Sequence, residues 1–208
     1  NGIGYICVGN VVMDLLAVHL HFSDVVFTTL GALFNIGCIW LPLGKIATEK
    51  WGAARTQSNF WLLRNFAAVV MGSCAIWGYF GHPYIACAFL LGGAFIFYGC
   101  RSAGSVMTTA LVGNITRENE RGKLLAFASM AQNIITAIVF IAMTFVLLQV
   151  EKLGAGQAIW ALFGIILFGA FCGVLSAVCL RNIDESDAIM KAAKKPWANS
   201  IWTAPSWR

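Results

Sequence analysis

Asp14 and Arg101 are ionisable residues that lie within long apolar stretches of the sequence. A charged side chain at the centre of a bilayer costs roughly 2.5–3.5 kcal/mol on insertion scales, so such residues usually face a cavity or one another. Counted along helices that rise about 1.5 Å per residue, the two residues come out at similar depth. They are therefore predicted to form either a substrate or proton site in a central cavity or an ion pair that only fixes helix packing.

Amide side chains accompany these two residues. Asn10 lies four positions before Asp14 and so shares its helix face. Three more amides occur in other apolar stretches, and Ser129 and Thr136 continue the stripe of the last two: Asn35, Gln132 and Asn133. We expect the stretches that carry these residues to face a cavity. Residues 60–80 and 157–180, taken to lack interior ionisable or amide groups, are expected to be peripheral.

The elements that must position these residues are apolar helices. Hydrophobic residues make up 59% of the chain and charged residues 11%, whereas soluble domains carry about 25% charged residues. Six apolar stretches approach or exceed the roughly 20 residues that a helical span requires, at about 3–22, 25–44, 60–80, 84–113, 122–149 and 157–180. The sequence predicts an all-α membrane protein, with a six-helix bundle over 1–182 and a cytoplasmic or interfacial tail over 183–208.

The orientation follows from the basic residues, which accumulate on the cytoplasmic side of membrane proteins. All but two of the fourteen Lys and Arg residues fall to one side of the predicted spans; Arg101 lies within a span and Lys152 on the opposite side. The residues on the common side are Lys45, Lys50, Arg55, Arg64, Arg117, Arg121, Lys123, Arg181, Lys191, Lys194, Lys195 and Arg208. Both termini are predicted to be cytoplasmic, and lipid headgroups explain the net charge of +5 better than nucleic acid does.

Other features narrow the class of protein. The seven cysteines lie in apolar stretches without metal-ligand spacing, which favours a packing role. No nucleophile–base pair, metal cluster or phosphate loop occurs, so neither an enzyme nor a cofactor is predicted. Trp197, Trp202 and Trp207 in the tail are typical of a segment at the membrane interface, and a docking segment for a partner is the alternative. The chain begins with Asn1 and no signal peptide is predicted, which leaves the true start open.

The connection over residues 42–55 carries glycines, an acid and bases at spaced positions. It resembles the G-x-L-a-D-R-x-G-R-R loop of the major facilitator superfamily, with one more residue between the glycines. In that comparison the gating-loop residues are Gly44, Glu49, Lys50, Gly52 and Arg55. Glycines permit a tight turn and close helix approach, and charges at helix ends can form switchable ion pairs.

Further elements extend the resemblance over residues 5–180. Arg101 and Gly104 are similar to the family's intramembrane R-x-x-x-G motif, with the glycine one position early. Residues 114–123 resemble its loop before the fifth span, and Asp14 lies where several proton-coupled members carry an acid. The resemblance implies one six-helix half of a twelve-helix transporter, with solute bound between two halves at mid-membrane.

Two functions follow from these observations. The first is secondary transport of a small solute, coupled to protons through Asp14 and Arg101, by a fragment of a transporter or by a half that pairs with another copy or a partner. The second is a structural or assembly subunit of a larger membrane complex, for which the missing second half and the Trp-bearing tail are the evidence. In both cases the expected partners are the lipid bilayer and other membrane helices.

Overall fold

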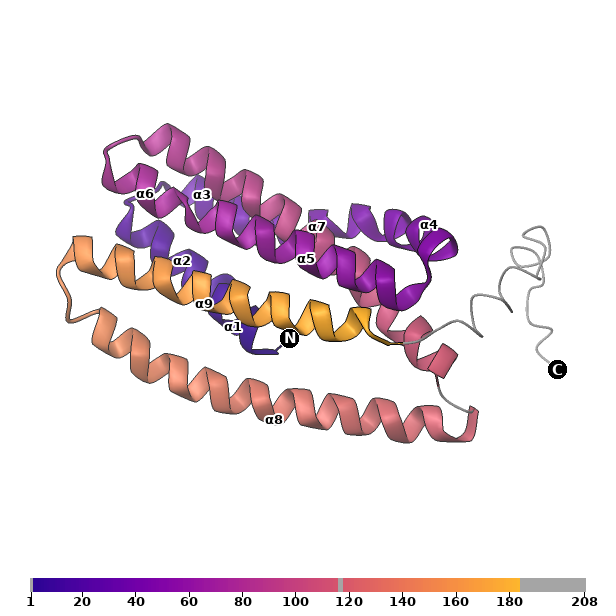
Figure 1. The fold of residues 1–208 in the computed structure, drawn as a ribbon. Helices are drawn as coiled ribbons and strands as arrows, with labels where there is room; N and C mark the ends of the chain where they lie inside the picture. Colours follow the sequence, from indigo (N-terminus) through magenta and orange to yellow (C-terminus); the bar gives the residue numbers. More distant parts are fainter. Residues whose placement is uncertain (1, 116–117, 184–208) are drawn as a thin grey trace.

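The computed structural model of the chain describes residues 2–115 and 118–183, and these residues form helices and short turns without a strand (Figure 1). The predicted all-α class is therefore confirmed. The elements are α1 (Gly2–Val8), α2 (Asn10–His19), α3 (Asp24–Ile36), the 3₁₀ turn η1 (Gly37–Trp40), α4 (Leu41–Trp51), α5 (Ala53–Gly72), α6 (Cys74–Tyr79), α7 (Pro83–Ile115), α8 (Glu118–Val150) and α9 (Ala155–Arg181).

Five helical segments of the described chain are long and apolar enough to cross a membrane, which makes the chain a multi-pass integral membrane protein. They are Asp24–Trp51, Ala53–Tyr79, Pro83–Thr108, Glu120–Val150 and Gly156–Arg181. The first predicted span corresponds to α1 and α2, a shorter apolar segment that is interrupted at Gly9. At 1.5 Å per residue this segment extends about 25 Å, somewhat less than the roughly 30 Å hydrocarbon core of a bilayer.

The charged segment that the sequence placed in a loop is almost entirely helical. Helix α4 continues through Lys45 and Lys50 to Trp51, and α5 begins at Ala53. Gly52 alone separates the two helices, with φ at 83°, a conformation that glycine adopts without steric cost. The connection expected over residues 42–55 is thus helical on both sides of Gly52, because nothing else in that segment stops a helix.

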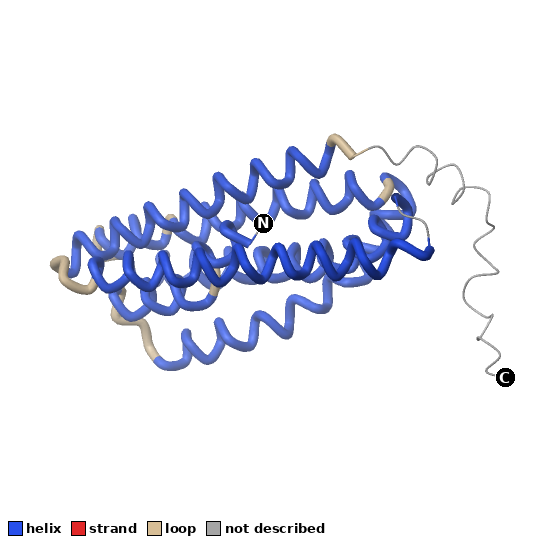
Figure 2. Tube along the Cα trace, turned by 90° about the horizontal axis from the view of Figure 1, so that it is seen from below, coloured by secondary structure: helices blue, strands red, loops and turns tan. Residues whose placement is uncertain are grey.

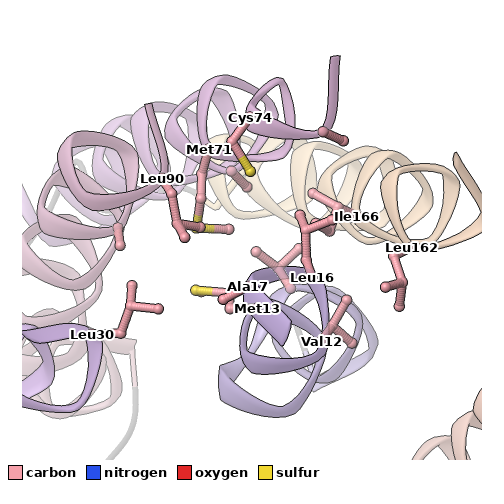
Figure 3. Packing of buried hydrophobic residues seen from close by; sticks show 14 of the residues in the cluster. Val12, Met13, Leu16, Ala17, Leu30, Met71, Cys74, Leu90, Leu162 and Ile166 are labelled. Carbon is pink, nitrogen blue, oxygen red and sulfur yellow. The ribbon is translucent and has the colours of Figure 1, made fainter. Parts of the chain in front are cut away.

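Helix α5 lies against both α7 and α9 and is central to the bundle (Figure 1). Side chains from α2, α3, α5, α6, α7 and α9 converge in the core, where Leu16, Met71, Leu90 and Ile166 are fully buried (Figure 3). Residues 60–80 are thus not peripheral, contrary to the expectation from sequence. Helix α8 runs along the outside of the bundle and most of its side chains are exposed (Figures 1 and 2).

The helices run back and forth along one long direction (Figure 2). The α2–α3, α6–α7 and α8–α9 turns lie at one end, and the α4–α5 connection at Gly52 lies at the other (Figure 1). Lys152 therefore lies at the opposite end from Lys50 and Arg55, as the alternation of basic residues predicted. The expectations for Arg117 and for residues 184–208, including the three tail tryptophans, fall outside the described residues.

The contact between α5 and α7 depends on Gly93. A Cβ atom at this position would lie 2.7 Å from Met71 Cβ and 2.8 Å from Met71 Cα, too close for an ordinary contact. We expect Gly93→Ala to lower the stability of the chain by about 1–3 kcal/mol, because α5 and α7 must move apart. The midpoint of thermal unfolding in detergent micelles measures this loss.

Gly92 supplies a matched control, since it precedes Gly93 on the same helix and a Cβ atom there would meet nothing within 4 Å. Gly92→Ala is expected to leave the midpoint unchanged or slightly higher, because alanine favours a helix more than glycine does. Equal midpoints for the two variants would contradict the close packing of α5 against α7.

Candidate functional site

A face of α5 carries buried polar side chains that pack between α7 and α9. The buried polar and charged residues of the described chain are Thr56, Gln57, Ser58, Arg64 and Asn65. Gln57 Nε2 donates a 2.8 Å hydrogen bond to Thr108 Oγ1 of α7, and Ser58 Oγ donates a 2.8 Å hydrogen bond to the Ala177 carbonyl of α9. These bonds join three helices across the bundle and hold the polar face of α5 inward.

Arg64 belongs to this face, although the sequence counted it among the basic residues that flank a connection on the cytoplasmic side. The residue lies in the interior of α5 and only 2% of its surface is exposed. Its guanidinium carbon lies 5.4 Å from the ring centroid of Trp61 and 5.7 Å from that of Phe97. Cation–π contacts of this kind contribute up to about 2 kcal/mol where the cation is desolvated, and they help to keep an arginine inside the bundle.

Arg101 lies in the interior of α7, as the sequence predicted, and is half-buried. Its guanidinium carbon lies 4.2 Å from the ring centroid of Tyr5 in α1 and 4.9 Å from that of Phe34 in α3. The aromatic contacts of the side chain therefore connect α1, α3 and α7. Its Nη1 atom is buried and makes no hydrogen bond among the described residues.

The two arginines lie along the same stretch of α7. Arg64 contacts the ring of Phe97, and Arg101 follows Phe97 by four residues, about one helical turn along α7. The charge of Arg101 acts electrostatically on Arg64. The interior of the bundle thus holds a pair of like charges surrounded by the rings of Tyr5, Phe34, Trp61 and Phe97.

Asp14 and Tyr98 line the same cavity, and Asp14 and Arg101 both act electrostatically on the Tyr98 hydroxyl. The side chain of Asp14 is exposed and borders this cavity of about 120 Å³, whose lining also includes Met13 and Leu30. No ion pair joins Asp14 to Arg101 in the described part of the chain. The two predicted site residues thus act on one tyrosine and do not form an ion pair with each other.

The predicted amides do not gather around Arg101. Asn35 of α3 and Gln132 and Asn133 of α8 are exposed, and the side chain of Asn10 lies outside the described part of the structure. Thr136 borders a second, largely apolar cavity of about 330 Å³ between α1, α2 and α8. Tyr5, whose ring contacts Arg101, lines this cavity too.

Of the predicted gating-loop residues, the glycines have clear structural roles. A Cβ atom on Gly44 would lie 2.6 Å from the Ala103 carbonyl oxygen, so this glycine lets α4 approach α7. Glu49, Lys50 and Arg55 are exposed around Gly52, and they form no ion pair with one another in the conformation described. Lys50 Nζ instead lies 5.9 Å from the Trp51 ring centroid.

Metal-ligating side chains are not clustered in the described residues: no group of three or more His, Cys, Asp or Glu residues could hold an ion there. Comparisons with protein-family models, with curated protein sequences and with solved structures found no match to this chain.

The contact between Arg101 and Tyr5 can be measured by a double-mutant cycle. We expect Arg101→Met and Tyr5→Leu to destabilise the chain by amounts that are not additive, with a coupling of about 0.5–2 kcal/mol, because each variant removes the same cation–π contact. The measurement is the free energy of unfolding of the two single variants and the double variant in mixed micelles.

A control cycle pairs Arg101→Met with Tyr84→Leu. Tyr84 is 90% exposed at the start of α7, and its effect should add to that of Arg101→Met within experimental error. Additivity in both cycles would rule out an energetically significant contact between Arg101 and Tyr5.

Proposed function

We propose that the chain is a six-span half of a secondary transporter that moves a small solute and resembles the major facilitator superfamily. The observation that carries this proposal is the placement of Asp14 and Arg101. They come from helices far apart in sequence, and both act on Tyr98 beside a cavity. Ionisable groups inside a helical membrane protein commonly mark a pathway for a solute or a proton.

The exposed polar residues support the pairing of this half with another. Asp14, Asn35, Gln132 and Asn133 are exposed on α2, α3 and α8. Each would be costly against lipid tails, and contact with a second half, another copy or a water-filled space between them would remove that cost. The α1–α2 segment would then act as the sixth span, and both termini would lie on the cytoplasmic side with Lys50, Arg55 and Arg181.

Proton coupling is the role proposed for Asp14. Its carboxylate borders a cavity and has no ion-pair partner in the described chain, so it is free to exchange a proton as the cavity changes exposure. Arg101 would hold its charge throughout, because a guanidinium does not lose its proton in proteins. Asp14 would thus bind and release the proton, and Arg101 would contact the solute.

Vesicles that contain the purified full chain and a pH-sensitive dye test this proposal. Nitrate, glucose, alanine and choline are added separately under an imposed proton gradient. At least one solute is expected to drive proton movement, and Asp14→Asn should reduce that movement about tenfold or more because it removes the group that titrates. Asp24→Asn is the matched control, since Asp24 lies at the exposed start of α3, outside the cavity.

Solute-driven proton movement that persists in both Asp14→Asn and Arg101→Ala would count against the proposal. A structural or assembly subunit is the second candidate, favoured by the same exposed polar side chains, which any protein partner would cover. It predicts no solute-driven movement and recovery of the native chain with other subunits in a large complex. A native particle of two such halves alone would exclude it.

A further inference from the structure

We propose that the 330 Å³ cavity between α1, α2 and α8 binds one acyl chain of a membrane lipid, which enters from the leaflet at the α8–α9 end of the bundle. We call this cavity the α8 slot. The inference goes beyond the proposed function, because it holds for a transporter and for an assembly subunit alike. The lining of the slot, its dimensions and its access to the surrounding bilayer support it.

The lining of the α8 slot is mostly hydrocarbon. Ile6 and Val12 come from the α1–α2 segment, and Phe140 and Met143 come from α8. No charged side chain of the described residues lines the slot. Thr144 does line it, but its hydroxyl donates a 3.0 Å hydrogen bond to the Phe140 carbonyl of the same helix. A polar solute would therefore lose its hydration in the slot and find few groups to replace it, whereas a hydrocarbon chain would not.

The slot is long and narrow. The Cys7 thiol lies 3.9 Å from Met143 Sδ, which sets α1 beside the second half of α8. The α2–α3 and α8–α9 turns share one end of the bundle, so α2 and α8 run in the same direction along the slot (Figure 1). From Thr136 to Leu147 the slot extends about 16 Å at 1.5 Å per residue, which gives its 330 Å³ a mean cross-section of about 20 Å². These dimensions suit one extended hydrocarbon chain.

The position of the slot along α8 corresponds to one leaflet. The membrane-spanning part of this helix is Glu120–Val150, so Thr136 lies near its middle and Leu147 near its end at the α8–α9 turn. Half of a hydrocarbon core of roughly 30 Å is about 15 Å, close to the length of the slot. Because helices and lipid chains both run across the bilayer, a lipid of that leaflet would have its headgroup beyond Leu147 and its chain end beside Thr136.

The bilayer has direct access to the slot. Val11 and Phe140 line it and are 51% and 56% exposed, whereas Val12 and Met143, which also line it, are buried. Helix α8 runs along the outside of the bundle (Figure 2), so the opening of the slot is part of the lipid-facing surface. An acyl chain in the slot would supply the dispersion contacts that its lining loses when the space is empty.

Photolabelling of the purified full chain in vesicles tests the proposal. The vesicles contain phosphatidylcholine and a trace of the same lipid with a diazirine in the middle of one acyl chain, and mass spectrometry locates the labelled residues. Lipids that only surround the protein reach exposed residues such as Phe145. A chain in the slot is expected to label the buried Met143 as well.

The position of the diazirine tests the direction of the chain. A diazirine near the methyl end is expected to label Thr136, and a diazirine near the ester is expected to label Leu147, because the two residues lie at opposite ends of the slot. The reverse order would mean that the chain comes from the other leaflet, and it would overturn the assignment of the leaflet.

A variant that fills the slot assigns the labelling of Met143 to this cavity. Thr136→Trp introduces an indole at a half-buried position of the lining, and labelling of Met143 should fall about tenfold because the indole displaces several buried methylene groups. Ile135→Trp is the matched control, since Ile135 precedes Thr136, is exposed and does not line the slot. Thr136→Val removes only the hydroxyl, and both of these variants should label Met143 as wild type does.

The proposal is overturned if labelling of the wild-type chain is confined to exposed residues such as Phe145, or if Thr136→Trp labels Met143 as strongly as wild type. An unlabelled slot in a chain that migrates as a dimer would overturn it too, and would assign the slot to a second copy. The wild-type labelling decides the test even if Thr136→Trp does not fold. None of these results depends on solute-driven proton movement, so the slot and the proposed function are tested separately.

Discussion

Helix α5 lies between α7 and α9, and small residues line its contacts with both. Ala67, Ala68 and Gly72 are buried on α5, and Gly93 of α7 lets the backbone and Cβ of Met71 approach closely. Within a membrane the hydrophobic effect does not hold helices together, so this close packing and a few interhelical hydrogen bonds must do so. The hydrogen bonds of Gln57 to α7 and of Ser58 to α9 hold polar side chains of α5 inside the bundle.

The arginines show how such an interior tolerates charge. A central arginine costs roughly 2.5–3.5 kcal/mol on insertion scales, and a desolvated cation–π contact recovers about 2 kcal/mol. Two rings beside each guanidinium therefore offset the burial of each charge taken alone. They do not offset the repulsion between Arg64 and Arg101. Electrostatics, more than packing, distinguishes this part of the bundle from the apolar core around Met71 and Leu90.

The apolar stretches predicted the long helices well, because length and hydropathy decide whether a segment can span a bilayer. Arg101 was also placed correctly inside a helix. Arg64 was missed as a buried residue because its nearness to Lys50 and Arg55 grouped it with the basic residues that flank a connection. The spacing of Gln57, Trp61, Arg64 and Asn65 puts them on one helix face, and that periodicity could have revealed it. Tertiary packing decides whether Asp14 and Arg101 form an ion pair and how exposed α8 is, and no local sequence pattern specifies that packing.

Gly52 has a mechanical consequence for the bundle. A single residue connects α4 to α5, so while both helices stay intact there is no slack between them. The angle between the two helices can change only through the backbone torsions at this glycine. Gly44 packs α4 against Ala103 of α7, the helix that carries Arg101, so a change in that angle must also change the contact between α4 and α7. The backbone torsions of Gly52 thus couple the charged end of the bundle to the packing of α4 on the helix that carries Arg101.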